Sequence, residues 1–473
     1  MSRKLWFYTA ALVMAVISLA VARGVVVHRR AARFGASSNG KQTTLPNGWR
    51  ISPAGRQISL QGDLVFKMLF TPDGKNLVVN TGGFHDHDVT VIDVATEKVK
   101  STANVWKDWA GMAIDPATSS LFVSGGGQLG PLFYSGMKND GASDQATADA
   151  RKPVIRLSLK DGNLEQQPGI SIQNLPETER FVAGIAVAPR GVLYVVNTQT
   201  DSVYRLSGDG YGTVISTKVE YRPYGVAISP DAQTVAVSNW GAESVSILDA
   251  KTLQSKSLIK VGNHPNELVY GKDGRLWVAC SGTNSVSVIA KNQVIETIKT
   301  SIDPTDPVGS TPDGLALAPD GKTLYVANAD NNDVAVIDVS DKKESRVVGF
   351  IPTAWYPSAV AISPDGKKLF VGVGKGLYSR ANDPSESAKS ITDNSKTPYD
   401  YIGRVLNGAV SVVDIPGAAQ LATYTNEVVA NRPNPQATID QAEADRIQKN
   451  AFSKIKHVLY IIRENRTYDQ VFG

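Results

Sequence analysis

The chain has 473 residues, of which 42% are hydrophobic and 20% charged, and its formal net charge is +4. A charge this small, without any block of Lys or Arg, argues against nucleic-acid binding. The single cysteine, Cys280, excludes an internal disulfide bond, and we expect it to be a small buried residue. A nucleophilic Cys280 would need a histidine partner, for which His264 is the nearby candidate.

The first 30 residues are predicted to be a signal peptide or a membrane anchor. Arg3 and Lys4 precede an apolar run over residues 5–22, the pattern of a secretory signal or a short transmembrane segment. Ala20 and Ala22 provide the small residues that signal cleavage favours, whereas the length of the run favours a retained anchor. Both alternatives place the protein outside the cytoplasm, either periplasmic or secreted, with residues 5–22 anchoring it to the inner membrane if they are not cleaved. Residues 31–55 are expected to form a flexible lead-in.

Residues 314–338 predict three short strands joined by two turns, with the turn signal Pro-Asp-Gly between the first two. The same pattern recurs at intervals of roughly 41–48 residues, the spacing of propeller blades. Seven copies are visible, each with room for a fourth outer strand. We therefore expect an all-β, seven-bladed β-propeller over residues 56–430. Residues 56–60 and 422–429 look like strands outside the repeats, and one is expected to complete the other's blade.

The sequences Tyr-Val-Ala-Asn at 325–328 and Tyr-Val-Val-Asn at 194–197 resemble the YVTN family of β-propeller repeats. The resemblance extends over about residues 57–427. It implies the architecture and is nearly silent on activity, because fold does not imply function.

Three hairpins between second and third strands are enlarged, at residues 84–88, 128–152 and 375–407. They belong to blades 1, 2 and 7, which become neighbours when the ring closes, so we expect one wall on one face. Long loops are often functional, and this wall is predicted to bind a small-molecule or phosphoester ligand, or a protein or cell-surface partner. Connections between blades should bring aromatic and basic residues to the same face. The predicted ligand-binding residues are His85, His87, Trp109, Arg222, Tyr224, Trp240, His264, Trp355 and Tyr356.

Two alternatives weaken this prediction. Aromatic residues at these positions could plug the propeller channel instead of binding a ligand. The run His85-Asp86-His87-Asp88 could hold a metal ion, but no third ligand is visible in the sequence, and a solvated polar loop tip is the favoured interpretation.

The tail has a different pattern. Residues 431–454 predict a linker with a short polar helix, and an apolar run from 455 to 462 predicts a strand of a parallel sheet. The residues that follow, from Glu464 to Gly473, resemble the opening Glu-Asn-Arg-Ser/Thr-Phe/Tyr-Asp-x-x-Phe-Gly of a phosphoesterase family that includes bacterial phospholipases C and acid phosphatases. The resemblance implies an α/β fold like that of alkaline phosphatase, a divalent metal ion, and Glu464 and Asn465 as metal ligands.

The nucleophile of that family would lie downstream of Gly473, so residues 455–473 are interpreted as an incomplete remnant and this chain is expected to be inactive on phosphoesters. Two functional hypotheses remain. One is an exported propeller–phosphoesterase fusion whose full-length form hydrolyses phosphoesters with a divalent metal. The other is a non-catalytic extracytoplasmic propeller that binds a ligand or a partner. A third hypothesis, in which the propeller is itself an enzyme like the lactonase-type propellers, has no supporting constellation of residues.

Overall fold

The computed structural model describes residues 35–36, 42–105, 107–127, 152–378, 403 and 406–433, together with single residues and short pieces between 446 and 459. The chain divides into two compact units, Met1–Asn431 and Arg432–Gly473. All the described strands lie in the first unit, and they form the predicted propeller.

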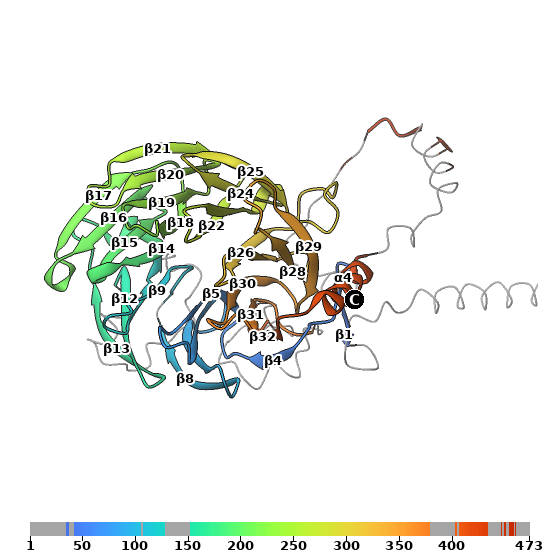
Figure 1. The fold of residues 1–473 in the computed structure, drawn as a ribbon, viewed down its shortest axis with the longest axis horizontal. Coiled ribbons are helices and arrows are strands. Elements are labelled where there is room, and N and C mark those ends of the chain that lie inside the picture. The colour runs from blue at the N-terminus through green and yellow to red at the C-terminus, as the bar shows by residue number, and fades with distance from the viewer. Residues whose placement is uncertain are drawn as a thin grey trace, which may run out of the picture. The chain divides into compact units, whose positions relative to one another are not determined.

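Seven antiparallel sheets stand around a central axis, with the first strand of each blade at the axis and the fourth at the rim (Figure 1). From the axis outward, blade 1 consists of β5 (Leu64–Phe70), β6 (Asn76–Gly82), β7 (Asp88–Asp93) and β8 (Lys98–Asn104). Blade 2 consists of β9 (Met112–Ile114), β10 (Ser120–Ser124), β12 (Val154–Lys160) and β13 (Asn163–Ile170). Blade 3 consists of β14 (Phe181–Ala188), β15 (Val192–Asn197), β16 (Ser202–Ser207) and β17 (Thr213–Lys218). A fifth short strand, β11 (Gly126–Gly127), pairs with the inner edge of β14.

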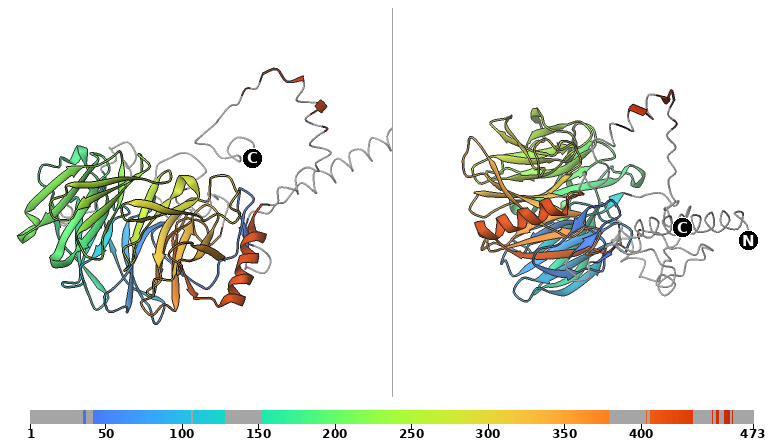
Figure 2. Two further views of the ribbon diagram at one scale, coloured as in Figure 1. Left: turned by 45° about the horizontal axis from the view of Figure 1, so that its top comes forward. Right: turned by 90° about the vertical axis from the view of Figure 1, so that its right-hand side faces the viewer.

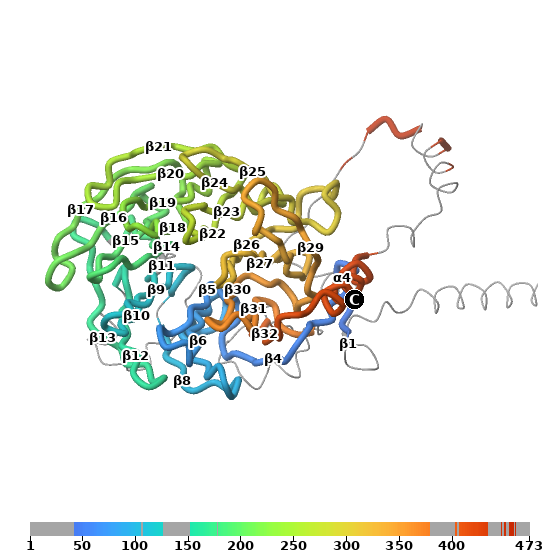
Figure 3. The backbone as a smooth tube through the Cα atoms, in the orientation of Figure 1, coloured from blue at the N-terminus to red at the C-terminus, as the bar shows by residue number. Residues whose placement is uncertain are grey.

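The remaining blades repeat this order, and each fourth strand leads into the first strand of the next blade (Figure 3). Blade 4 consists of β18 (Pro223–Ile228), β19 (Thr234–Asn239), β20 (Ser244–Asp249) and β21 (Ser255–Lys260), and blade 5 of β22 (Pro265–Tyr270), β23 (Leu276–Cys280), β24 (Ser285–Ala290) and β25 (Gln293–Lys299). Blade 6 consists of β26 (Pro312–Leu317), β27 (Thr323–Asn328), β28 (Asp333–Asp338) and β29 (Arg346–Pro352). Blade 7 consists of β30 (Pro357–Ile362), β31 (Lys368–Val373), β32 (Ala409–Asp414) and β4 (Arg56–Ser59). In the described part of the chain, short 3₁₀ helices lie in connections at Glu177–Glu179, Pro189–Gly191, Asp209–Tyr211 and Ser281–Thr283.

The blades hold together because their second and third strands are covered on both faces by neighbouring sheets. Every residue of β6, β10 and β23 is buried, and Phe122, Trp277 and Phe370 are among the largest side chains with no exposed surface. Burying one large apolar side chain contributes roughly 1.5–3 kcal/mol. The apolar and β-branched composition of these strands therefore follows from packing between blades.

The turns between first and second strands also repeat. The Asp320 carboxylate accepts a hydrogen bond from the Lys322 amide at 3.0 Å, and Gly321 between them has φ of +71°, which favours glycine. Thr71 and Ser363 each donate a hydrogen bond of 2.6 Å to the Asp two residues later in the equivalent turns. The Pro-Asp-Gly signal in the sequence thus has a direct structural cause.

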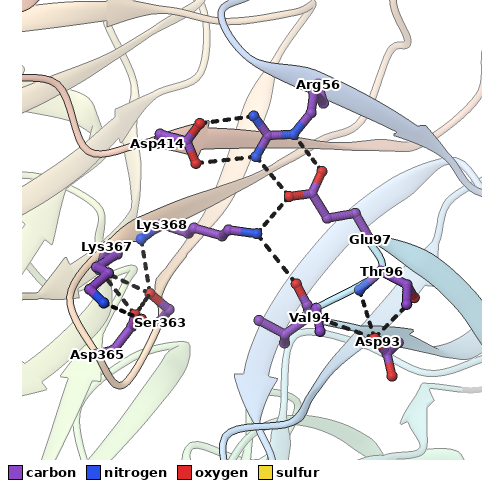
Figure 4. A network of polar contacts seen from close by, with 11 residues as sticks. Arg56, Asp93, Val94, Thr96, Glu97, Ser363, Asp365, Lys367, Lys368 and Asp414 are labelled. Atoms are coloured by element: carbon purple, nitrogen blue, oxygen red, sulfur yellow. Dashed lines mark hydrogen bonds and ion pairs between the residues drawn. The ribbon is translucent and has the colours of Figure 1, made fainter.

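The ring closes through β4, which pairs with β32 as the fourth strand of blade 7. This confirms that the segment beginning at Arg56 completes a blade. Figure 4 shows the charged network at the closure: the Arg56 guanidinium binds Asp414 at 2.9 Å and Glu97 at 2.5 Å, and Lys368 binds Glu97 at 2.7 Å. Glu97 belongs to blade 1, so the network joins the closing strand to the next blade as well as to its own.

The other predicted closing strand, 422–429, is instead helical. It lies in α4 (Ala418–Asn431), which packs along the outer strand β29 (Figure 2). Leu421, Thr425 and Val428 follow a spacing of four and three residues, which places them on one face of a helix; Leu421 and Thr425 contact the strand at Gly349, and Val428 is buried. Of the β-branched residues in this segment, Thr425 and Val428 therefore belong to a helical stripe, whereas Thr423 and Val429 are exposed.

Part of the expected lead-in is structured. β1 (Gly35–Ala36), β2 (Thr43–Thr44) and β3 (Arg50–Ile51) form a small antiparallel sheet. Residues that flank its strands bind the end of α4, since Asn431 accepts a hydrogen bond from Gln42 at 3.1 Å and donates one to Ser52 at 2.9 Å. The first unit thus joins residues from both ends of its sequence.

Several predicted segments lie outside the described residues: the apolar run 5–22, most of the two longest loops, nearly all of the predicted polar helix, and Glu464 and Asn465. Within the part of the chain that the structure describes, no helix is long and apolar enough to cross a membrane.

Candidate functional site

In a four-stranded meander the hairpins alternate between the two ends of the strands, so the second-to-third hairpins and the connections between blades open on one face, called here the upper face. On this face, at the axis, lies a cavity of about 550 Å³. Six of the seven blades, or the connections leading into them, contribute to its wall. The lining residues are Trp109, Phe181, Thr198, Gln199, Asp201, Tyr221, Arg222, Tyr224, Trp240, Asn266, Ser281, Thr311, Asp313 and Tyr356.

Five of the nine predicted ligand-binding residues meet in this cavity, namely Trp109, Arg222, Tyr224, Trp240 and Tyr356. The other four lie elsewhere on the upper face. His264 stacks on Trp240 with ring centroids 4.1 Å apart and an interplanar angle of 13°. His264 therefore contacts the cavity-lining ring of Trp240.

Trp355 is half-buried, and its ring lies 6.0 Å from the Lys375 ammonium. The same ammonium is 3.9 Å from the centroid of the Tyr356 ring, a cation–π contact at the rim. Lys375 opens the long loop of blade 7, so the start of that loop does reach the edge of the axial cavity.

The rim residues share an unusual backbone. Each directly precedes the proline that begins a first strand, and each has a positive φ, which costs a non-glycine residue about 1 kcal/mol; they are Arg222 (51°), His264 (51°), Thr311 (55°) and Tyr356 (68°). In every case the carbonyl accepts a hydrogen bond from the amide that follows the second strand, as between Arg222 and Trp240 at 2.9 Å. These hydrogen bonds offset the cost of the positive φ and hold the side chains of these four residues around the mouth of the cavity.

The floor of the cavity is acidic. Asp313 is half-buried there, and one of its carboxylate oxygens accepts a hydrogen bond of 2.6 Å from the amide of Asn266. Removal from bulk water, followed by the nearby carboxylates of Glu267 and Asp330, raises the pKa of Asp313 to about 7. Near neutral pH this carboxyl group is therefore divided between its protonated and ionised forms.

Below the floor, an ion pair crosses the axis. The Lys67 ammonium, from blade 1, lies 2.6 Å from a carboxylate oxygen of Glu267, from blade 5. Strand register places small residues at the corresponding positions of the other five blades: Gly111, Gly184, Gly225, Gly314 and Ala359. The space left beside the pair is about 20 Å³, enough for about one water molecule. The cavity is thus a pocket rather than an open channel.

The aromatic wall is continuous over three blades. The Trp109 ring lies 4.8 Å from Phe66 and 5.2 Å from Phe181, measured between centroids. Burial raises the pKa of Tyr224, and burial together with the Asp313 charge raises that of Tyr356. Both phenols therefore stay neutral and can donate hydrogen bonds.

His85 and His87 lie in a separate polar cluster where blades 7, 1 and 2 meet. The imidazole of His87 contacts an Asp108 carboxylate oxygen at 2.7 Å through Nδ1, and Asn80 donates to the other oxygen at 3.0 Å. Burial lowers the pKa of His87, but the hydrogen bond and charge of Asp108 outweigh this and raise it. His85 binds instead the Leu406 carbonyl at 2.8 Å, in the loop of blade 7.

The two histidines thus have different partners, and among the described residues no group of three His, Cys, Asp or Glu side chains could hold a metal. Asp86 is exposed as expected for a loop tip, whereas Asp88 is buried and accepts a hydrogen bond from Thr90 at 2.9 Å. Residues 85–88 are therefore partly buried, and the two histidines contact neighbouring blades, so this segment is not a fully solvated loop tip.

Cys280 is fully buried, as expected, and burial raises the pKa of its thiol. Its sulfur lies 3.6 Å from the Ser287 hydroxyl, while the His264 ring is stacked on Trp240.

The fold and the site define a class: a seven-bladed β-propeller whose axial channel is closed by an ion pair, leaving a pocket on the upper face. Residues 181–369 match the family model described as SMP-30/Gluconolactonase/LRE-like region. Over 151 residues the chain is 32% identical to the Escherichia coli K12 protein "Uncharacterized protein YncE"; the match covers 30% of this chain and 42% of that protein, less than half of the relative's length. The chain is thus similar to this family over residues 181–369 and to YncE over 151 residues, and its own fold is a seven-bladed β-propeller.

Solved structures agree on the fold. The virginiamycin B lyase from Staphylococcus aureus superimposes with a TM-score of 0.52 at 11% identity, covering 76% of this chain and 99% of that one. The WD40 repeats of RRP9 give 0.54 at 10% identity, covering 76% and 98%. A Kuenenia stuttgartiensis hydrazine synthase chain gives 0.50 at 20% identity, covering 67% and 94%. Identities this low show a common fold alone.

Cavity residues that the sequence prediction missed include Phe181, Asp201, Asn266, Thr311 and Asp313. A signal for three of them was present. Aligning the repeats on the proline that opens each first strand puts Thr311 with Arg222 and Tyr356, and puts Asn266 and Asp313 with Tyr224.

Proposed function

We propose that this protein is a non-catalytic binding propeller that takes a small organic ligand into the axial cavity. The observation that carries the proposal is the cavity itself, about 550 Å³ with six aromatic side chains and a closed floor. Pockets that bind small molecules typically have volumes of roughly 300–1,000 Å³, apolar walls and a few convergent polar groups. Among the described residues, the cavity is lined by neither histidine nor cysteine, and its polar groups are suited to hydrogen bonding with a ligand.

Three probes that share a benzyl or phenyl group and differ in charge test this proposal: benzyl alcohol, benzoate and benzyltrimethylammonium. We expect at least one to bind, as measured by calorimetry and by the fluorescence of Trp109 and Trp240. Trp240→Ala should weaken that binding about tenfold through the lost aromatic contact. Leu258→Ala, an exposed position on the outer strand β21, is the matched control and should bind like the wild type. If none of the three binds, or both variants bind equally well, the cavity is not the site.

A second candidate function, hydrolysis of phosphoesters with a divalent metal, is supported by the sequence of residues 464–473 alone. On this proposal Glu464 and Asn465 bind the metal through side-chain oxygens, and the propeller presents substrate to the catalytic domain. Calorimetric titration with Mn²⁺ of the chain and of its Glu464→Gln variant tests the ligand assignment. Equal metal affinity of the two proteins would remove the support for this candidate. Release of nitrophenol from an aryl phosphate tests activity directly.

We also propose that the protein is exported, with residues 5–22 as a cleaved signal or a retained anchor; this rests on their hydropathy. The enlarged loops of blades 7, 1 and 2 would then be available to a protein or cell-surface partner. Fractionation of bacteria that express a C-terminally tagged chain should recover it outside the cytoplasm, and removal of residues 1–30 should retain it inside. Equal distribution of the two forms would contradict export.

A further inference from the structure

Among the described residues, the lining of the axial cavity has one more acidic than basic side chain. The acidic side chains are Asp201, whose carboxylate accepts a hydrogen bond from the Arg222 amide at the rim, and Asp313 at the floor, and the basic one is Arg222. Arg222 is exposed at the rim, where its Nε donates a hydrogen bond of 2.9 Å to the Tyr221 hydroxyl. The nearest base at the axis, Lys67, is already neutralised by Glu267. A ligand that enters the cavity therefore meets an uncompensated carboxyl group at the floor.

That carboxyl group is Asp313, and it retains binding capacity. Asn266 donates to one of its oxygens, and no hydrogen bond to the other oxygen occurs within the described part of the chain. A nearby cation favours the ionised form of a carboxyl group. A positively charged ligand would therefore stabilise the Asp313 carboxylate, which burial otherwise disfavours. An anionic ligand would meet repulsion at the same place.

The walls around this carboxyl group are aromatic. Tyr224 and Tyr356 both lie close enough to Asp313 for its charge to raise their pKa values. The Tyr356 ring already accepts a cation on one face, since the Lys375 ammonium lies 3.9 Å from its centroid. Aromatic faces combined with a desolvated carboxylate form the arrangement that recognises organic ammonium groups.

We propose that the ligand of the axial cavity is an organic cation, an ammonium or quaternary ammonium compound whose charged group contacts Asp313 and whose apolar part lies against the aromatic wall. This inference rests on the proposed function, because it names the ligand class of the same cavity. A free small molecule is the expected form, since the ion pair between Lys67 and Glu267 closes the axis beneath.

Calorimetric titration of the full chain with benzyltrimethylammonium, benzyl alcohol and benzoate tests the ligand class. We expect benzyltrimethylammonium to bind about tenfold more tightly than benzyl alcohol, and benzoate to bind most weakly. The affinity for the cation should rise between pH 6 and pH 8 as Asp313 ionises, because its pKa is about 7 in the free protein. Asp313→Asn should abolish both the preference and the pH dependence. Asp209→Asn, which removes an exposed carboxylate from the hairpin between β16 and β17 on the opposite face, is the matched control and should retain both.

Each outcome decides a specific point. If benzyl alcohol binds as tightly as the cation, or benzoate binds best, the ligand class is wrong while the proposed function stands. If Asp313→Asn keeps the preference for the cation, the assignment of Asp313 is overturned. If none of the probes binds, both proposals fail. Should Asp313→Asn not fold, as judged by its thermal unfolding, Tyr356→Leu replaces it and should reduce the preference for the cation by removing one aromatic face.

Discussion

Two regions of the upper face differ in how they use polar residues. In the cluster where blades 7, 1 and 2 meet, the His87 imidazole and the Asn80 amide together occupy both oxygens of Asp108. In the axial cavity, Asp313 receives one hydrogen bond from Asn266 and faces open space. The first arrangement fixes blades to one another, whereas the second leaves capacity for a ligand.

The comparison teaches that sequence proximity is a poor guide to a binding site in a propeller. His85, Asp86 and His87 are adjacent in the chain, yet the two histidines bind different neighbours. The described lining of the cavity instead comes from six blades or their connections, with between one and four residues from each. Buried polar groups that hydrogen-bond to one another stabilise the fold. Ligand binding is expected instead where a polar group still has an oxygen or nitrogen without a hydrogen-bond partner in the protein.

The largest expected effect is on stability. Asp108→Ala removes the acceptor for two donors at a position that is only 1% exposed, and loss of one partner from a buried polar pair costs about 3 kcal/mol. Urea unfolding should show this loss. Asp86→Ala, exposed in the adjacent loop, is the control and should change the free energy of unfolding by less than about 0.5 kcal/mol. Similar midpoints for the two variants would show that the cluster is not structural.

A second prediction tests whether the two regions are independent. At a concentration one hundred times its dissociation constant, a cavity ligand should raise the free energy of unfolding by about 2.7 kcal/mol. Asp108 lies outside the cavity lining, but it precedes Trp109 and shares the Asn80 amide with the Trp109 carbonyl. If the two regions are independent, the same increment is expected in wild type and in Asp108→Ala. Thermal or urea unfolding with and without benzyltrimethylammonium measures it. An increment that disappears in Asp108→Ala would mean that the cluster and the cavity act as one site.

A smaller effect should follow from pH. The pKa of His87 is raised in the folded protein, so folding retains a proton that the unfolded chain loses above its own pKa of about 6.5. The stabilisation is complete below that pH and is lost as the pH rises through the folded pKa. The free energy of unfolding should therefore fall between pH 6.5 and 8 in the wild type. His87→Asn should have a flatter profile; an unchanged slope would assign the titration to another group.

The smallest effect is expected on the opposite face, at the ring closure. Hydrogen bonding to Arg56, followed by that to Lys368, lowers the pKa of Glu97 to about 2. This stabilisation is present above the unfolded pKa and is lost as the pH falls from about 4.5 towards 2. Arg56 is nearly half exposed, so Glu97→Gln should cost only about 0.5–1 kcal/mol at neutral pH. The variant should bind cavity ligands normally, and weakened binding would couple the two faces.

The sequence by itself determined the architecture. Turn signals such as Pro319-Asp320-Gly321 and the alternation of apolar strands specify a small sheet that cannot bury both faces alone, and repetition supplies the missing neighbours. The closing strand beginning at Arg56 was also predictable, because a blade lacked its fourth strand. The helix α4 was not, since its β-branched residues satisfy a strand pattern as well as a helical one until β29 is in place.

Only the tertiary structure decided where the candidate site lies. Lys67 and Glu267 are 200 residues apart and meet because the closed ring brings blades 1 and 5 to opposite sides of one axis. The two side chains can meet across the axis because the five other blades have Gly or Ala at that level, and the pair then closes the cavity from below. Local sequence fixes a strand and its turn, since these depend on neighbouring residues. A site at the axis depends on the closure of the whole ring, and no single blade contains that information.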